Sequence, residues 1–224
     1  MLVSCCFNVL PFTRSDLNPH LRSHELLSLL GIAATPLVLA GLGWTHPYDL
    51  TRQTASYWYT LHYILLPIFP LLGVNLWWLL ANIPGVWAWL AQLLAFVYIP
   101  FYGGLDVLAG MGTGFILKHA QATKQPALAA VNIWLFDVGH ELANVGGWAF
   151  LLACVLTSAL LIRRLGRAAV PGALLLVTAA ISFLTSHIYY PVGVLTMLGM
   201  AIGFAGLQWA RLRLVTPIPP GENQ

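Results

Sequence analysis

The sequence has very little charge, few cysteines and no basic stripe. Only 8% of its 224 residues are charged, whereas a soluble domain carries roughly 25%, and this argues against a soluble protein. The three cysteines, Cys5, Cys6 and Cys154, have a spacing that supports neither a disulfide framework nor a cysteine zinc site. The absence of a basic stripe excludes nucleic acid as an expected partner. Alternating segments of strand length are also missing, which argues against a β-barrel.

Long apolar segments fill the chain instead, and 59% of the residues are hydrophobic. Segments of about 20 apolar residues are typical of membrane-spanning helices, which satisfy their own backbone hydrogen bonds in lipid. We therefore predict an all-α polytopic transmembrane helix bundle with six spans. The spans are expected at about 25–44, 57–81, 86–117, 129–162, 168–187 and 191–210. Pro67, Pro70 and Pro100 are expected to kink or unwind their helices.

The basic residues predict the orientation of the bundle. Residues 1–24 and 212–224 are expected to be cytoplasmic segments that flank a transmembrane domain over 25–211, with no cleavable signal peptide. Seven Lys and Arg residues then fall on the side of both termini and three on the other side, which accounts for all ten. The positive-inside rule therefore predicts that both termini are cytoplasmic. We expect the chain in the bacterial inner (plasma) membrane. Membrane lipid is the expected partner.

Several ionisable residues interrupt the predicted spans, and no Lys or Arg accompanies them. A carboxylate in the bilayer is unfavourable unless it is paired, protonated or hydrated. Counted from the cytoplasmic ends at 1.5 Å per residue, the polar positions of four helices reach about 30 Å. This common height is the outer boundary of the membrane. The residues counted are His62, Asp106, His140 and His187, and the acids Asp137 and Glu141 lie beside His140 in the same predicted span.

Helical phase groups the polar residues of FDVGHELANVGGW, residues 136–148. Asp137, His140, Glu141 and Asn144 fall on one face about 100° wide. A glycine face containing Asp106 recurs over 103–114, and a second ridge of small residues over 139–147 lies beside the acidic face. We expect the helices that carry these two ridges to pack together and to bring Asp106 toward Asp137 and Glu141.

The set of nitrogen and oxygen donors predicts a pocket for a divalent metal such as zinc, open to the extracytoplasmic side. The same pocket could take a small polar or lipid-like ligand. Hydrolysis by a metal-activated water would make Glu141 and Asp137 the candidate catalytic residues. His46, Tyr189 and Tyr190 are expected at the mouth of the pocket. The predicted metal ligands are His62, Asp106, His140 and His187.

Other interpretations remain open from the sequence. The acids and histidines could simply meet water and one another at the membrane boundary. A zinc-protease helix is disfavoured because Asn144 stands where the His-Glu-x-x-His motif has its second histidine. A single haem between two histidines is a weaker alternative to a divalent metal. A non-catalytic accessory subunit of a larger respiratory or photosynthetic membrane complex, with other membrane-protein subunits as partners, is the alternative of a different class.

Overall fold

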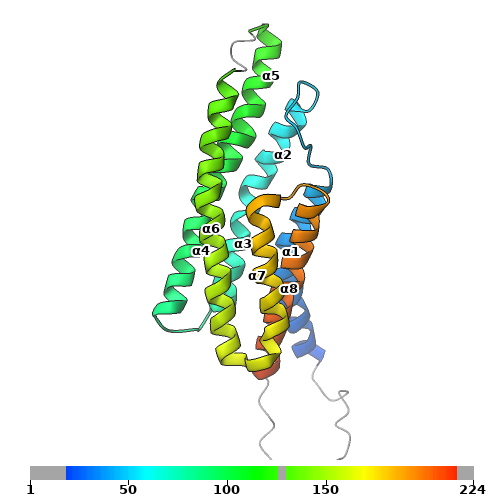
Figure 1. The fold of residues 1–224 in the computed structure, drawn as a ribbon. Helices are drawn as coiled ribbons and strands as arrows, with labels where there is room; N and C mark the ends of the chain where they lie inside the picture. The colour runs from blue at the N-terminus through cyan, green and yellow to red at the C-terminus, as the bar shows by residue number, and fades with distance from the viewer. Residues whose placement is uncertain (1–18, 126–129, 216–224) are drawn as a thin grey trace, which may run out of the picture.

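The computed structural model describes residues 19–125 and 130–215, and every regular element within these ranges is a helix. Figure 1 shows an elongated bundle in which α5 and the first part of α6 project beyond the other helices. The elements are α1 (Pro19–Trp44), α2 (Ala55–Ile68), α3 (Pro70–Leu80), α4 (Val86–Leu105), the π-helix η2 (Asp106–Gly112), α5 (Thr113–Thr123), α6 (Val131–Leu165), the 3-10 helix η4 (Gly166–Ala169), α7 (Val170–Ser186) and α8 (Val192–Val215).

All six predicted apolar segments form helices. The second segment divides where expected, because α2 ends at Ile68 and α3 begins at Pro70. The third segment differs from expectation, since α4 continues through Pro100 and the irregular stretch is the π-helix that begins at Asp106. A π-helix hydrogen-bonds from residue i to i+5, so it changes the phase of the side chains that follow it.

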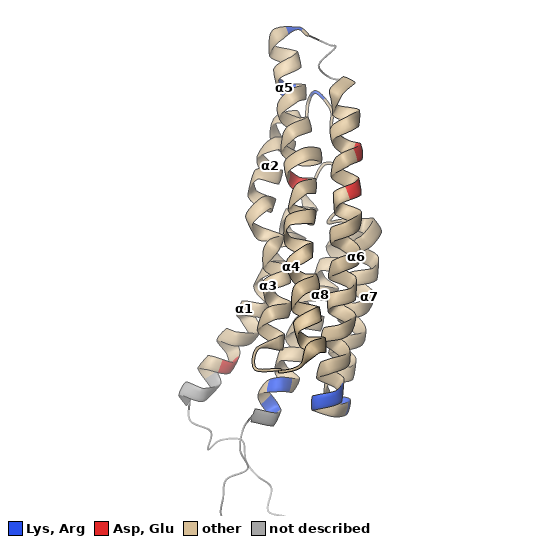
Figure 2. Cartoon of the chain, turned by 90° about the vertical axis from the view of Figure 1, so that its left-hand side faces the viewer, with Lys and Arg blue, Asp and Glu red and all other residues tan. Residues whose placement is uncertain are grey.

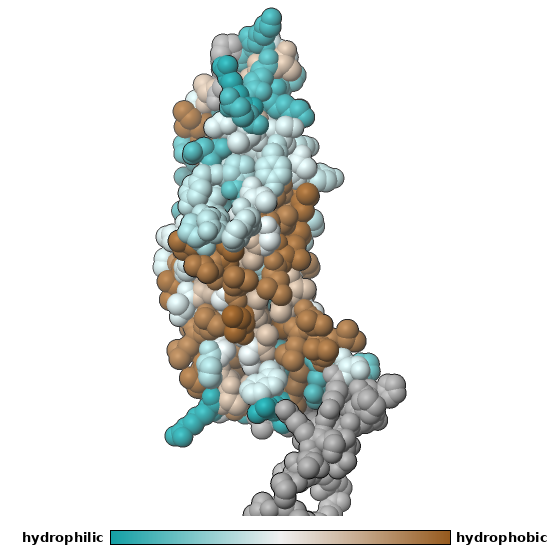
Figure 3. All heavy atoms as spheres, turned by 90° about the vertical axis from the view of Figure 1, so that its right-hand side faces the viewer, coloured by the Kyte–Doolittle hydropathy of each residue, from teal (hydrophilic) through white to brown (hydrophobic). Residues whose placement is uncertain are grey.

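Within the described parts of the chain, five segments are long and apolar enough to cross a membrane. They are Ser23–Trp44, Ala55–Leu80, Val86–Thr123, Val131–Ser186 and Val192–Arg213. The fourth contains both α6 and α7, and Gly166, with φ 63°, ends α6 at the point where the chain turns back (Figure 1). The face of the molecule drawn in Figure 3 has a broad apolar band with more polar surface above and below it. The fold is therefore an all-helical one compatible with a membrane protein.

Charged residues lie mainly toward the two ends of this bundle. Figure 2 shows Lys and Arg at the end of the bundle where α6 turns into α7 and where α8 finishes, and also at the tip of α5. Acidic residues lie in the half nearer α5, apart from Glu25 near the start of α1. At the end where α8 finishes, Arg211 also forms hydrogen bonds to the backbone of α3. Its guanidinium donates to the carbonyl oxygens of Trp78, at 2.7 Å, and of Ala81, at 3.2 Å. It thereby caps the C-terminal end of α3, where carbonyl groups lack helical partners.

Close helix contacts at small residues position the polar side chains. A Cβ on Gly139 of α6 would lie 2.7 Å from the Cβ of Ala109, so the expected packing of the third and fourth predicted spans is confirmed at this point. The glycine face over 103–114 packs differently from the prediction, because Gly110 and Gly114 contact His62 and Tyr59 of α2. The large rings on α2 need small residues opposite them. The glycine face that carries Asp106 therefore packs on α2 and not on the acidic residues of α6.

Candidate metal centre

Three histidines from distant parts of the chain meet near one end of the bundle. His46 lies just after α1, His62 lies in α2, and His187 follows the last residue of α7. One ring nitrogen from each lies within 4.8 Å of the others. The His46 ring centroid is 5.1 Å from that of His62 and 5.6 Å from that of His187. We call His46, His62 and His187 the histidine cluster.

Hydrogen bonds fix which nitrogen of His46 and of His62 is free, and they hold one nitrogen of His187. The Nδ1 atom of His46 lies 2.7 Å from the carbonyl oxygen of Pro47, and Nδ1 of His62 lies 2.8 Å from that of Trp58. A carbonyl oxygen can only accept, so both Nδ1 atoms carry hydrogen and both Nε2 atoms keep a lone pair. Nδ1 of His187 is bonded to the Tyr102 hydroxyl at 2.6 Å. This is the pattern of metal-binding histidines, in which the second nitrogen is held by an outer partner.

One nitrogen of the histidine cluster, Nε2 of His46, has no hydrogen-bond partner. It is buried and forms no hydrogen bond with any residue in the described ranges. A buried polar atom without a partner is unfavourable by about 1–3 kcal/mol. A metal ion bound to the lone pair would remove this deficit.

The environment also keeps the imidazoles neutral. Burial lowers the pKa of His46 to about 4, although its hydrogen bond to Pro47 opposes the shift. Burial lowers the pKa of His187 well below its usual value, and the nearby histidines His46, His62 and His140 lower it further. Both rings are therefore uncharged at neutral pH, which is the protonation state that coordinates a metal.

Glycines make room for the His62 ring and for the loop that follows His187. A Cβ on Gly110 of η2 would lie 2.2 Å from Cδ2 of His62, so the imidazole rests directly on the glycine. A Cβ on Gly43 would lie 2.2 Å from the carbonyl oxygen of Ile188, next to His187. His187 itself has φ 46°, a left-handed value that strains a residue with a side chain. The backbone of α1 and the start of α8 thus hold the His187 loop in an unfavourable conformation.

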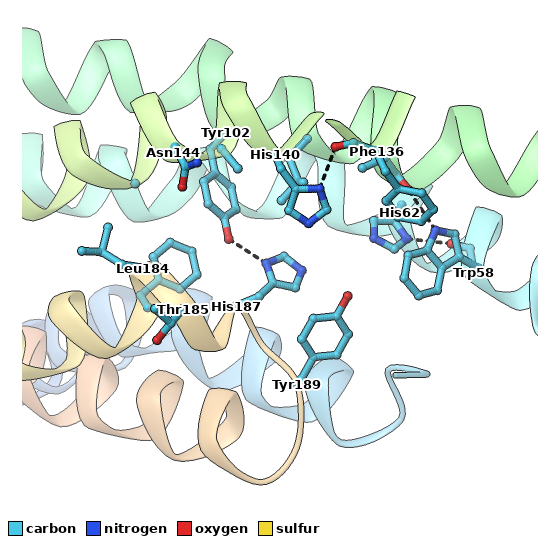
Figure 4. A pocket seen from close by; sticks show the side chains of 15 residues that line it. Trp58, His62, Tyr102, Phe136, His140, Asn144, Leu184, Thr185, His187 and Tyr189 are labelled. Carbon is cyan, nitrogen blue, oxygen red and sulfur yellow. Dashed lines mark hydrogen bonds between the residues drawn. The ribbon is translucent and has the colours of Figure 1, made fainter. Parts of the chain in front are cut away.

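A cavity of about 140 Å³ adjoins the histidine cluster. Figure 4 shows His62, His140 and His187 around a common space, with the Tyr189 phenol beside His187. Burial raises the pKa of Tyr189 to about 12, so its hydroxyl keeps its proton at neutral pH. The cavity wall is mixed, with aromatic rings and a few polar groups, as in many small-ligand sites. The lining includes Trp58, Tyr102, Phe136, Phe183, Asn144 and Thr185.

The predicted metal ligands separate into three groups. His62 and His187 belong to the histidine cluster. His140 lines the cavity, but it is exposed and stands outside the cluster, and its Nδ1 donates to the carbonyl oxygen of Phe136 at 2.6 Å. Asp106 is fully buried in η2, and neither carboxylate oxygen has a hydrogen-bond partner among the described residues.

The predicted catalytic acids Asp137 and Glu141 lie on the exposed side of α6. The cavity is lined from α6 by Phe136, His140, Ala143, Asn144 and Gly147. Successive helical residues are 100° apart, so each acid is rotated away from the lining residue that precedes it. Neither acid is part of the cavity wall.

His46 is the cluster member that the sequence did not identify as a ligand. We expected it only at the mouth of the pocket, because the height estimate used positions inside helices. His46 lies two residues beyond the end of α1. The signal that points to it is its position directly after the first predicted span, at the end of that span expected to lie level with His62 and His187.

No protein-family model, curated protein or solved structure matches this chain. The described residues define an all-helical fold with membrane-length apolar helices and three clustered histidines beside a cavity.

Proposed function

We propose that the chain is a multi-pass protein of the inner (plasma) membrane with six spans and cytoplasmic termini. The segment Val131–Ser186 crosses twice in this arrangement, because α6 and α7 run in opposite directions (Figure 1). The α6–α7 turn and the end of α8 carry five arginines, at positions 163, 164, 167, 211 and 213. The positive-inside rule supports placing this end in the cytoplasm. The histidine cluster then faces outward.

The function that the geometry supports best is the binding of a divalent transition metal such as zinc. The observation that carries this proposal is the approach of three imidazole nitrogens to within 4.8 Å of one another. Tetrahedral zinc with bonds of about 2.0–2.1 Å holds its ligand atoms roughly 3.3 Å apart. The nitrogens therefore need to close by at most about 1.5 Å, which rotations of the side chains can supply.

The surroundings favour a metal with an open coordination position. Three histidine ligands leave a fourth position for water or substrate, as in catalytic zinc sites. The adjoining cavity supplies the space, since His62 and His187 form part of its wall. Asp106 is the one carboxylate buried within the described ranges, and we assign it the counter-charge for the metal. The ligand of the cavity is then a small polar or lipid-like molecule.

Hydrolysis is the reaction class that this arrangement serves, because a bound metal supplies a Lewis acid and activates water. A proton acceptor must also reach the cavity. His140 fulfils this condition, since it lines the cavity and its hydrogen bond to Phe136 leaves Nε2 free to accept. We therefore assign general-base function to His140 in place of Glu141 and Asp137.

Metal analysis of the purified full chain tests the metal proposal. After incubation with zinc and gel filtration, we expect about one zinc per wild-type chain by mass spectrometry. His46→Ala, His62→Ala and His187→Ala should each lower zinc affinity by at least about tenfold. His119→Ala is the matched control, because His119 is exposed on α5 and outside the cluster. Wild-type protein that holds no more zinc than the three variants would refute the proposal.

A second measurement separates loss of ligands from loss of fold. Circular dichroism should show the same helical content in all variants. Substitution of cobalt for zinc should give the visible absorption of a tetrahedral site in wild type and in His140→Ala, but not in the cluster variants. Retention of metal with loss of ester hydrolysis in His140→Ala would support its role as a base.

A further inference from the structure

A second cavity lies at the opposite end of the bundle, between the α3–α4 turn and the end of α6. It has a volume of about 250 Å³. Its wall combines two guanidinium groups, a tryptophan and several apolar residues. The lining residues used below are Gly85, Trp87, Ala88, Leu160, Arg163 and Arg164. We propose that this cavity binds the phosphate of an anionic phospholipid from the adjacent leaflet.

The charge of the cavity is positive and unopposed. Arg163 and Arg164 lie in the last turn of α6, and both are exposed. Neither has a hydrogen bond or ion pair with another residue in the described part of the chain. No carboxylate lines the cavity. Paired guanidinium groups suit a phosphate because each can donate two parallel hydrogen bonds to its oxygens.

Backbone groups add to the positive potential of the arginines. α4 begins at Val86, and its N-cap Gly85 provides no side-chain hydrogen bond to the first turn. Gly85 and Ala88 both line the cavity, so the first turn of α4 borders the bound anion. The N–H groups at a helix start carry partial positive charge and favour a phosphate.

The apolar residues beside the arginines favour a lipid over a soluble phosphate. Leu152, Leu156, Leu160 and Arg163 recur at helical spacing along α6, which gives an apolar stripe that ends at the arginine. Leu156 and Leu160 pack against the small buried cluster of Leu80, Ala88 and Ala91, where α6 meets the α3–α4 turn. Acyl chains can therefore lie along the stripe while the headgroup meets Arg163.

Two exposed tryptophans beside the cavity indicate that it lies at the level of the lipid headgroups. Trp87 is 55% exposed and Trp89 is 63% exposed at the start of α4. Tryptophan is enriched at the headgroup level of membranes. The inference rests on the membrane placement proposed above, but it is independent of the metal at the other end.

Lipid binding by the full chain in neutral detergent tests this inference. We would measure dissociation constants by native mass spectrometry for phosphatidylglycerol, phosphatidylcholine and soluble glycerol 3-phosphate. Wild type should prefer phosphatidylglycerol to phosphatidylcholine by at least about tenfold, because both guanidinium groups attract its net negative charge. Glycerol 3-phosphate should bind much more weakly, because it lacks the acyl chains.

Single substitutions locate the site. Arg163→Gln and Arg164→Gln should each remove most of the preference for phosphatidylglycerol, whereas Arg163→Lys should retain part of it because the charge remains. Arg167→Gln is the matched control, since Arg167 is exposed at the same end but does not line the cavity. Equal losses in all three Gln variants would indicate diffuse surface attraction and overturn the inference. Tight binding of glycerol 3-phosphate would overturn the lipid as source.

The outcomes also distinguish this inference from the proposed function. Loss of the preference for phosphatidylglycerol in Arg163→Gln, with wild-type zinc content, would support the arginine cavity as the lipid site and leave the metal proposal unaffected. Recovery of wild-type chain in the aqueous fraction without detergent would contradict the membrane placement itself. A lower thermal midpoint of Arg163→Gln in lipid-free detergent, with unchanged lipid affinity, would assign the arginine to capping of α6 and overturn its role in the site.

Discussion

Gly110→Ala provides a sharp test of how the histidine cluster is held. The added Cβ would lie 2.2 Å from Cδ2, 2.3 Å from Cγ and 2.6 Å from Cβ of His62. Ordinary contacts begin at about 3.4 Å, so the imidazole or the helix must move by roughly 1 Å. Metal sites require ligand distances within about 0.2 Å of their ideal values. The substitution should therefore lower zinc affinity by at least about tenfold, although it changes no ligand.

Stability should change in the same direction. An alanine in a helix is ordinarily favoured over glycine by about 1 kcal/mol. Overpacking a filled site instead lowers the free energy of unfolding by about 1–3 kcal/mol. Gly41→Ala in α1 is the control, because nothing lies within 4 Å of its added Cβ. Denaturant unfolding of the zinc-free protein should show that Gly41→Ala is neutral or stabilising and that Gly110→Ala is destabilising.

A double variant identifies the cause. His62→Ala removes the two ring atoms nearest to the new Cβ but leaves the His62 Cβ in place. Gly110→Ala should therefore be less destabilising in the His62→Ala background than in wild type, with a coupling of about 0.5–3 kcal/mol. Equal effects in both backgrounds, together with wild-type zinc affinity in Gly110→Ala, would refute the seating of His62 on this glycine.

Three further predictions concern other residues of the bundle. The free energy of unfolding should be about 1 kcal/mol higher for His187→Gly than for His187→Ala, because glycine adopts φ 46° without strain. Both variants should lose zinc binding in calorimetric titrations. Asp106→Leu should raise the stability of the zinc-free protein by about 1–4 kcal/mol and weaken zinc binding, as measured by thermal unfolding with and without zinc; a severe loss of stability would instead make this acid structural. Arg211→Gln should lower the thermal midpoint, since it removes charged hydrogen bonds worth about 1.5–3 kcal/mol at the end of α3; an unchanged midpoint would contradict that capping role.

The helices were predictable because membrane helices are encoded locally. Each apolar segment reports its own length and the prolines report the break between α2 and α3, so no knowledge of neighbours is needed. The π-helix over Asp106–Gly112 was not predictable in this way. It arises inside an apolar stretch without a local sequence signal, and it changes the direction of every later side chain in that segment.

The candidate site was only partly predictable, because it depends on which helices meet. Helical phase placed His140 and Asp137 on one face, but only the packing of α6 shows that His140 lines the cavity and Asp137 lies on the exposed side. Height estimates brought His62 and His187 to the same level. They missed His46, because a residue in a loop has no helical position from which height can be counted.

The origin of the three histidines has a consequence for biogenesis. His46 and His62 lie early in the chain, whereas His187 follows α7. The cluster therefore cannot exist until α7 has been made and α8, which packs on α7, has docked against α1. A metal ion bound there would connect the first and last parts of the chain and stabilise only the fully assembled protein. Metal occupancy would then serve as a checkpoint that distinguishes finished molecules from truncated or misassembled ones.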